Sequence, residues 1–279
     1  MQIWAHSLVK NEERYLWFAV ESVINYIDKL LLWDTGSTDK TKEIIKLLKR
    51  KHPEKIETNF LGEVTPEEFT KVRQDMLEAT KSDWFLVVDG DEIWWDASIN
   101  GVTDKIYTAK SDYESVVVPI VNLVGDIFHY QEKKAGRYFL AGKLGHYALR
   151  GIKRSIPGLS SSKPHGTWGW TDKDGIMIQE RDPEKILFLD APYIHATYLT
   201  RGGSRVFDKR VVKRPLKYKY ELGIRFPGNF YYPEVFFRER PAIVPFPWLK
   251  MDRSYFLRAL VETPLRKIKR RLFKGKIGY

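Results

Sequence analysis

Two aspartates separated by a single glycine follow an apolar run about one third of the way along the chain. The run covers residues 84–88, and Asp89, Gly90 and Asp91 come directly after it. An unbroken run of β-branched and aromatic residues is typical of a strand that is buried on both faces. In open α/β sheets, ligands bind beyond the carboxyl ends of such strands. Asp89 and Asp91 are therefore candidates for holding a hard divalent cation, although an ordinary polar turn would have the same composition.

A second acidic turn follows another apolar run. Residues 30–33 are apolar, and Asp34 and Ser37 belong to the Asp-Thr-Gly-Ser-Thr-Asp turn after them. Free backbone amides and hydroxyls at the start of a helix suit a sugar or the edge of a base. A plain helix cap with a glycine is the other interpretation. Because the carboxyl ends of parallel strands share one edge of a sheet, we expect Asp34 to lie near Asp89 and Asp91.

The elements that must position these acids alternate along the chain. Strands are predicted at residues 2–9, 30–33, 55–60 and 84–88, with helices between them. Asn11 is expected to cap the first helix, and Thr65 and Glu68 form a capping box for the third. The alternation predicts an α/β fold with a mostly parallel central sheet and helices on both faces. Further strands are expected at residues 115–121, 145–152, 186–189 and 193–199.

Basic charge is concentrated near the C-terminal end. The formal net charge is +11, yet residues 206–279 contain 19 lysines and arginines against 6 acidic residues, whereas the part before them contains 28 against 30. The same segment holds 7 of the 14 prolines and 15 of the 39 aromatic residues. These three shifts in composition predict a boundary near residue 205.

Composition also excludes several classes of protein. Hydrophobic residues make up 43% of the chain and cysteine is absent, which excludes intrinsic disorder, a disulfide framework and a cysteine nucleophile. The N-terminal residues do not have the pattern of a signal peptide, and no apolar run approaches the roughly 18 to 20 residues that span a bilayer. We therefore expect a cytoplasmic protein.

Three motifs taken together resemble a known family. Residues 9–13, 33–41 and 84–92 are similar to the family 2 glycosyltransferases of the GT-A fold. Residues 193–198 resemble a late His-x-(Ser/Thr)-Tyr segment found in the lipopolysaccharide-core β-glucosyltransferase subgroup, to which the chain looks most similar. The resemblance implies a Rossmann-like GT-A fold and a metal-dependent, inverting transfer of a sugar from a nucleotide diphosphate, UDP being favoured. The acceptor would be a hydroxyl of a glycan or of a lipid-linked molecule.

The resemblance also implies roles for individual residues. Asp34 would contact the base, Asp89 the ribose, and Asp91 the Mn²⁺ or Mg²⁺ ion that bridges the diphosphate. His195 would be a late metal ligand or diphosphate contact, and an imidazole ligand would favour Mn²⁺; a histidine satisfied within the core is the alternative. The implied donor-binding residues are Val9, Asn11, Glu12, Asp34, Ser37, Arg73, Asp89, Gly90 and Asp91, and the implied metal ligands are Asp91, Asp89 and His195.

The chain departs from the family pattern at two places. Arg73 matches a family arginine, but Gln74 stands where an asparagine is usual, and His165 lacks the neighbouring glutamate that the subgroup has. An inverting transferase needs a group that takes the proton from the attacking hydroxyl. Because the sequence does not identify that group, the candidate bases are Asp126 first, then Asp172 and Asp174.

Other residues are candidates for contacts with the acceptor or with phosphate. His165 and Trp168 lie in an aromatic loop that would face the acceptor, although His165 is also compatible with an ordinary loop position. Arg201 begins a basic cluster that would hold donor phosphates, and a solvated basic face is the alternative. The other members of this cluster are Arg205, Lys209 and Arg210.

The predicted organisation has two parts. Residues 1–205 would form the GT-A catalytic domain, with a nucleotide-sugar half up to about residue 95 and an acceptor half after it. Residues 206–279 would form a basic, aromatic and proline-rich extension. Its short amphipathic part, residues 264–274, suits the headgroup layer of an anionic membrane on the cytoplasmic side, with Leu265, Ile268, Leu272 and Phe273 facing the acyl chains. A basic tail that is solvated or folded over the catalytic domain is the alternative.

Two other functions compete with the transferase hypothesis. A sugar nucleotidyltransferase would share the architecture, but the sequence after the first predicted strand lacks the glycine-rich phosphate loop that such an enzyme needs. A basic nucleic-acid-binding protein would use the aromatic and basic C-terminal segment, but it would leave the two acidic strand ends unexplained. We therefore expect no nucleic-acid partner.

Overall fold

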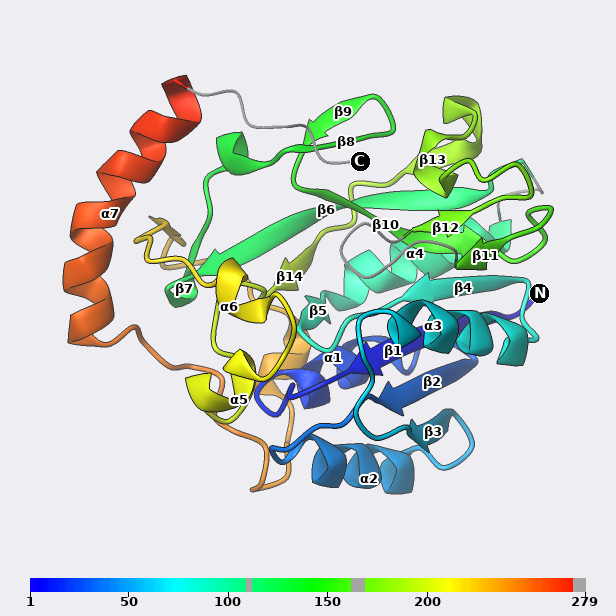
Figure 1. Ribbon diagram of the computed structural model, residues 1–279, viewed down its shortest axis with the longest axis horizontal. Coiled ribbons are helices and arrows are strands. Elements are labelled where there is room, and N and C mark those ends of the chain that lie inside the picture. Colours follow the sequence, from blue (N-terminus) through cyan, green and yellow to red (C-terminus); the bar gives the residue numbers. More distant parts are fainter. Residues whose placement is uncertain (109–111, 162–168, 273–279) are drawn as a thin grey trace.

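The first half of the chain alternates strands and helices, as predicted. The computed structural model describes residues 1–108, 112–161 and 169–272 (Figure 1). In order, the elements are β1 (Ile3–Val9), α1 (Leu16–Val23), β2 (Lys29–Asp34), α2 (Thr41–Lys51), β3 (Ile56–Phe60), α3 (Glu68–Ala79) and β4 (Trp84–Val87). The four strands lie within one residue of their predicted bounds. The alternation therefore delivers the ends of β1, β2 and β4 to one edge.

One of the two predicted helix starts is confirmed and one is wrong. The Thr65 amide donates to Glu68 Oε2 (2.9 Å) and the Glu68 amide donates to Thr65 Oγ1 (3.3 Å), which is the predicted capping box. Asn11 does not cap α1, whose N-cap is Tyr15. Instead Asn11 has a left-handed backbone (φ 53°), which turns the chain out of β1. Its side chain is thereby free to serve the neighbouring turn.

The second half adds shorter strands and the remaining helices. They are β5 (Glu92–Trp94), α4 (Asp96–Thr108), β6 (Ser115–Val124), β7 (Asp126–Tyr130), β8 (Tyr138–Leu140), β9 (Lys143–Gly145), β10 (Tyr147–Lys153), β11 (Ser160–Ser161), β12 (Trp170–Thr171), β13 (Ile186–Phe188), β14 (Tyr193–His195), α5 (Arg205–Lys209), α6 (Arg214–Lys217), β15 (Ile224–Arg225) and α7 (Arg253–Leu272). Single 3₁₀ turns cover Lys133–Ala135, Ile178–Glu180, Pro183–Lys185 and Glu234–Phe237.

Among the described residues, eleven strands form one curled sheet. Its main path is β15-β7-β6-β10-β4-β1-β2-β3, with β13 and β14 also paired to β6, and β5 paired to β14. The pairs β1/β2, β1/β4, β2/β3, β6/β13 and β6/β14 are parallel, whereas β10, β7 and β5 run against their neighbours. The predicted mixed, mostly parallel α/β sheet is confirmed.

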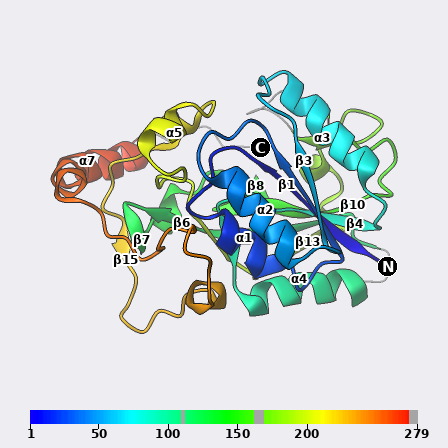
Figure 2. The same ribbon diagram turned by 90° about the horizontal axis from the view of Figure 1, so that it is seen from below.

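Helices cover both faces of the sheet, as predicted. Successive strand residues point to opposite faces, so neighbouring leucines of β2 belong to different cores. Leu30 and Leu32 pack in the cluster that includes residues of α1, α2 and α4. Leu31 packs with Val72 and Met76 of α3 on the other side. Figure 2 shows α1, α2 and α4 on one side of the strands and α3 on the other.

The C-terminal part runs along the far edge of the sheet. α7 lies at one end of the molecule, with its long side turned away from the sheet (Figures 1 and 2). It begins eleven residues before the amphipathic segment predicted from sequence, and Phe273 lies outside the described residues. None of the described helices is long and apolar enough to cross a bilayer. The predicted boundary near residue 205 stays a prediction.

Candidate functional site

The carboxyl ends of three parallel strands bring the acidic turns together. β1 pairs with β2 up to Val9 and Asp34, and β1 pairs with β4 on its other side. The turn after β2 is closed by Asp34, whose Oδ1 accepts the amides of Gly36 (3.1 Å) and Ser37 (3.0 Å). Asp34 is fully buried. Its carboxylate therefore shapes the turn in which Ser37 is presented.

Asn11 connects the loop after β1 to this turn. The backbone amide of Asn11 donates to Ser37 Oγ (2.8 Å), and its side-chain Oδ1 accepts a hydrogen bond from the backbone amide of Thr38 (2.7 Å). The Glu12 amide donates to Thr41 Oγ1 (2.8 Å) at the start of α2. Two predicted donor-binding residues, Asn11 and Ser37, are thus in direct contact.

Gly90 lies against the same loop. A Cβ atom at this position would come within 2.9 Å of Glu12 Cγ and 3.0 Å of Val9 Cγ1. The glycine therefore permits the turn after β4 to approach the loop after β1. This contact brings Val9, Glu12 and Gly90 together, and their role in donor binding stays a prediction.

Asp91 is the buried centre of the site. Its Oδ2 lies 2.6 Å from Arg201 Nη1 and 3.3 Å from His195 Nε2, and the residue is 0% exposed. Burial by itself favours the neutral acid, but the charges of Arg201 and His195 hold the pKa of Asp91 well below its usual value. Asp91 is therefore an anion, and its Oδ1 has no hydrogen-bond partner among the described residues.

His195 reaches Asp91 because β14 joins the sheet beside β5. His195 is paired with Glu92 in β5 and with Asn122 in β6. The Ala196 amide also donates to the Asp91 carbonyl (2.9 Å). The structure thus places His195 beside Asp91, and its role as a metal ligand or diphosphate contact stays a prediction. Among the described residues, its Nδ1 has no hydrogen-bond partner.

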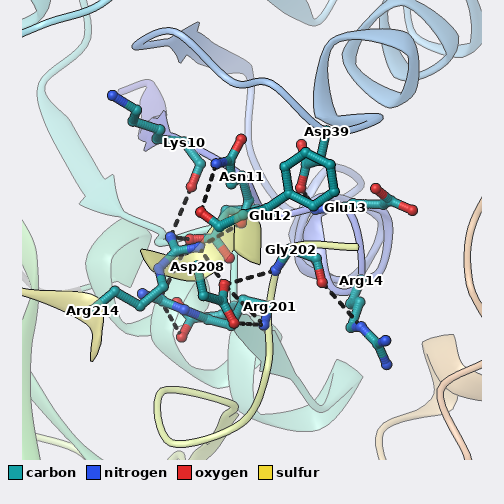
Figure 3. A network of polar contacts seen from close by, with 12 residues as sticks. Lys10, Asn11, Glu12, Glu13, Arg14, Asp39, Arg201, Gly202, Asp208 and Arg214 are labelled. Atoms are coloured by element: carbon teal, nitrogen blue, oxygen red, sulfur yellow. Dashed lines mark hydrogen bonds and ion pairs between the residues drawn. The ribbon is translucent and has the colours of Figure 1, made fainter. Parts of the chain in front are cut away.

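A second arginine fixes the loop after β1 from the C-terminal side. Arg214 donates to the carbonyls of Asn11 (2.5 Å) and Lys10 (2.8 Å), and it pairs with Glu12 and with Asp208 (3.1 Å) (Figure 3). Arg201 Nη1 also lies 3.4 Å from Glu12 Oε1. Burial raises the pKa of Glu12 to about 8 in spite of these two arginines.

Asp208 holds the start of the segment that carries these arginines. Its carboxylate accepts the amides of Arg201 (3.2 Å) and Gly202 (3.0 Å), and Asn11 Nδ2 donates to the Phe207 carbonyl (2.9 Å). Residues 201–217, which we call the 201–217 segment, therefore lie directly over the loop after β1. Figure 3 shows Arg201 and Arg214 converging on Glu12 from this segment.

Asp89 faces a different environment from Asp91. Its side chain is 38% exposed and lies 3.6 Å from Arg150 Nη2. Arg150 also pairs with the buried Glu92 and donates to Tyr193 Oη (3.1 Å). Burial raises the pKa of Glu92, which Arg150 opposes. The two aspartates of the motif thus have separate partners: arginine and histidine for Asp91, Arg150 for Asp89.

Arg73 and Asp89 line the same small cavity. Its wall is completed by His6, Leu8, Met76, Val87 and Trp170. Arg73 is largely buried, and its guanidinium lies over the Phe69 ring (4.5 Å to the centroid). Arg73 therefore approaches the exposed side of the motif, opposite the side of Arg201.

The candidate bases have partners of their own. Asp126 accepts the amides of Phe128 (2.9 Å) and Met251 (3.1 Å) and lies 2.6 Å from His129 Nδ1. The carboxylate of Asp172 accepts amides of its own turn and pairs with Arg181, and Asp174 pairs with Lys173 at the surface. His165 and Trp168 lie outside the described residues.

Three functional candidates were missed from the sequence. Arg150 comes from a strand whose sheet position could not be predicted, and Asp208 and Arg214 belong to a stretch that has the composition of a solvated basic face. Arg214 is 6% exposed and Asp208 7%, so both are interior residues. In the sequence, only the acidic Asp208 among the basic residues distinguishes this stretch from a surface cluster.

The residues around Asp91 were tested for their fit to a divalent cation. Among residues 1–108, 112–161 and 169–272, no group of three or more acidic or histidine side chains is arranged to hold a metal. Mg²⁺ and Mn²⁺ in nucleotide sites, however, are commonly held by one or two protein ligands together with water and substrate phosphate. The free Asp91 Oδ1 and the neighbouring His195 ring offer two such ligands. These two residues fit the ion.

Comparison with solved structures finds matches of low sequence identity. S. aureus TarS aligns over 70% of this chain and 37% of its own, with 12% identity and a TM-score of 0.43. TarS 1–349 in complex with UDP-GlcNAc aligns over 70% of this chain and 58% of its own, with 13% identity and a TM-score of 0.44.

A third similar structure comes from Mycobacterium tuberculosis. It is glucosyl-3-phosphoglycerate synthase in complex with Mg²⁺ and UDP, with 16% identity and a TM-score of 0.46, and it aligns over 70% of this chain and 71% of its own. The chain spans 37% of TarS and 61% of the unliganded TarS 1–349 structure. No curated protein matches the chain significantly.

The fold defines an α/β protein with acidic turns at the strand ends, and the family comparison makes the class specific. Residues 8–160 match the model of glycosyl transferase family 2. The match covers more than half of the chain, and it includes the turns of Asp34, Asp89 and Asp91. The chain belongs to glycosyl transferase family 2.

Proposed function

We propose that the protein is a metal-dependent, inverting glycosyltransferase that moves a sugar from a nucleotide diphosphate, with UDP favoured, to a hydroxyl group. The observation that carries the proposal is Asp91: a fully buried, ionised carboxylate at a strand end, with one oxygen unpartnered and with His195 and Arg201 beside it. Arg201 compensates the burial of this anion, and a buried carboxylate with a strongly shifted pKa and an unpartnered oxygen marks a candidate functional site.

The donor-binding roles are distributed along the strand ends. We propose that the turn of Asp34 and Ser37 meets the base, and that the more exposed Asp89 meets the ribose. Val9, Asn11, Glu12 and Gly90 would form the wall between these two positions, because they pack directly on the turns. Arg73 would contribute from the cavity that it shares with Asp89.

The leaving diphosphate would be stabilised by positive charge at Asp91. When bound there, a divalent ion held by Asp91 and His195 would neutralise the charge that develops on the leaving group. Arg201 pairs with Asp91, and Arg214 pairs with Glu12. Both guanidiniums have the fork geometry that suits phosphate oxygens. The 201–217 segment would therefore supply cations to the donor phosphates.

We propose Asp126 as the base, because it is a buried carboxylate whose Oδ1 lies 2.6 Å from His129 Nδ1. Its pairing with His129, 22% exposed, would allow the ring to relay a proton.

The acceptor and the location are also proposals. We propose a glycan or lipid-linked hydroxyl acceptor, a cytoplasmic location at the inner face of the membrane, and closest kinship with the lipopolysaccharide-core subgroup. Residues 1–205 would carry the transferase site and residues 206–279 the membrane-facing extension. The late Tyr193–His195 strand, whose histidine meets Asp91, supports the kinship.

A thermal-shift screen of nucleoside diphosphates with and without Mn²⁺ tests the donor proposal. Ligands that bind only the folded state raise its stability, so UDP with Mn²⁺ should raise the melting temperature more than UDP alone. Asp91→Asn should remove the metal-dependent part. Asp174→Asn, an exposed carboxylate on a distant turn, should keep it. The proposal fails if none of the diphosphates stabilises the wild-type protein.

A further inference from the structure

We infer that the outer face of α7 seats the protein on an anionic lipid surface. The inference rests on the proposed function for its acceptor side and assigns the membrane contact to particular residues. The helix has 20 residues, which corresponds to a length of about 30 Å. It lies at the end of the molecule, and its outer side faces away from every labelled element in both views (Figures 1 and 2).

The outer face is apolar along the whole helix. Large hydrophobic side chains recur there at intervals of three and four residues, which places them on one side. Their exposed fractions are 64% for Leu257, 67% for Val261, 62% for Leu265, 51% for Ile268 and 71% for Leu272. We call these five residues the α7 stripe. A stripe of this length is unusual on a surface that faces only water.

Basic residues border the α7 stripe on both sides. At about 100° per residue, Arg253, Lys267 and Arg271 fall on one border, and Arg258 and Lys269 on the other. The helix contains seven lysines and arginines and a single acid, Glu262. Apolar residues between two cationic borders are the pattern of a helix that lies in the headgroup layer of an anionic membrane.

The inner face fixes the helix with the α7 stripe outward. Tyr255 Oη donates to the Lys219 carbonyl (2.6 Å), and Thr263 Oγ1 accepts the Leu222 amide (2.9 Å). Arg270 pairs with the buried Glu221. These contacts cover most of the helix length, so rotating the stripe inward would break all of them.

The same contacts join the helix to the donor side of the molecule. Residues 219–222 follow α6 after a single residue, and Arg214 of α6 contacts Asn11 and Glu12 on the donor side. The membrane face and the proposed donor site are thus separated by one short stretch of chain.

A second copy of the chain is a weaker occupant for this face. Two α7 helices that meet along their stripes would bring two sets of cationic borders together, with only one acid on each helix to offset them. Anionic headgroups supply the missing negative charge at both borders. The charge pattern therefore favours lipid over self-association.

Co-sedimentation with phosphatidylcholine vesicles, with and without phosphatidylglycerol, tests this inference. Wild-type protein should partition onto the vesicles that contain phosphatidylglycerol and much less onto pure phosphatidylcholine. Val261→Glu with Leu265→Glu should lower that partitioning by roughly tenfold or more, because both changes put charge into the acyl boundary. The matched control is Phe139→Glu with Leu144→Glu, which places the same charges on apolar side chains that are 51% and 52% exposed in the β8/β9 hairpin.

Each outcome decides the inference. It is overturned if the stripe variant sediments like the wild type, if both vesicle types bind equally, or if light scattering shows a dimer that only the stripe variant dissociates. Circular dichroism and the UDP thermal shift, measured on both double variants, report folding and donor binding separately. If the wild-type protein shows the UDP thermal shift but does not bind vesicles, the membrane inference fails and the proposed transferase function stands. If it binds vesicles but shows no UDP shift, the proposed transferase function fails and the membrane inference stands.

Discussion

Two aspartates one residue apart acquire different properties from their surroundings. Asp91 is fully buried against Arg201 and His195, whereas the side chain of Asp89 is 38% exposed and faces Arg150. The difference arises because Gly90 lets the turn lie against Glu12, which directs the two carboxylates to opposite sides. At the residue scale, the close approach of this turn to Glu12 depends on the glycine between the two aspartates.

Adding one methyl group at Gly90 tests this point. In Gly90→Ala, the new Cβ would lie within 2.9 Å of Glu12 Cγ, and Glu12 is held in place by Arg214. Overpacking of this kind typically costs about 1 to 3 kcal/mol of unfolding free energy. Urea unfolding measures the change, and UDP affinity should fall with it.

Gly101→Ala is the matched control. This glycine lies inside α4, and a Cβ there meets nothing within 4 Å. Alanine in a helix interior is favoured over glycine by up to about 1 kcal/mol, so this variant should be slightly more stable than the wild type. Equal stability of Gly90→Ala and the wild type would contradict the account of the turn.

Sequence alone pointed to the acids and to Arg201, but it missed Arg150 and Arg214, which pair with Asp89 and Glu12. Asp34, Asp89 and Asp91 follow apolar runs, and a strand end is a local signal. Arg150 and Arg214 reach the site from distant parts of the chain; Arg214 pairs with Glu12 across 202 positions. No local pattern encodes such a contact, and a buried arginine has the same sequence signature as an exposed one.

At the scale of elements, the 201–217 segment and the loop after β1 act as one unit. Arg214 alone bonds two backbone carbonyls of that loop and pairs with two carboxylates. Its removal would leave Glu12 and Asp208 buried with less compensating charge. The geometry of the donor wall therefore depends on an element far away in sequence.

Arg214→Met should destabilise the protein by about 3 to 5 kcal/mol, the usual cost of breaking a buried ion pair from one side. Arg214→Lys should recover only part of the loss, because an ammonium cannot reproduce the fork to Lys10, Asn11 and Glu12. Chemical unfolding measures both. Arg210→Met is the control, since Arg210 is exposed and its contact with Thr38 Oγ1 is long (3.4 Å). A loss for Arg214→Met no larger than for this control would show that the segment is not anchored as described.

The elements that alternate regularly were predictable, and the irregular ones were not. The capping box of Thr65 and Glu68 and the first four strands follow from local pattern. The cap prediction for Asn11 was wrong because its side chain is used by the turn of Ser37 and Thr38 instead of by α1. The placement of β10 and β14 depends on pairing with β4, β5 and β6, which only the folded chain reveals.

At the scale of the whole molecule, one sheet edge and one terminal helix are joined through residues 219–222. The donor residues gather at the carboxyl ends of β1, β2 and β4, and α7 lies at the end of the sheet where β7 and β15 pair (Figure 1). This arrangement separates the proposed donor site from the exposed face of α7. The basic C-terminal composition thus has a structural counterpart in the α7 stripe and its borders.

The central claim is that Asp91 is the anchor of a metal-assisted diphosphate site. Isothermal titration of UDP into the wild-type protein, once with Mn²⁺ and once with EDTA, tests it most directly. The account predicts that Mn²⁺ lowers the Kd for UDP by about tenfold or more, and that Asp91→Asn removes this difference while Asp174→Asn retains it. A wild-type Kd that is the same with Mn²⁺ and with EDTA would contradict the account.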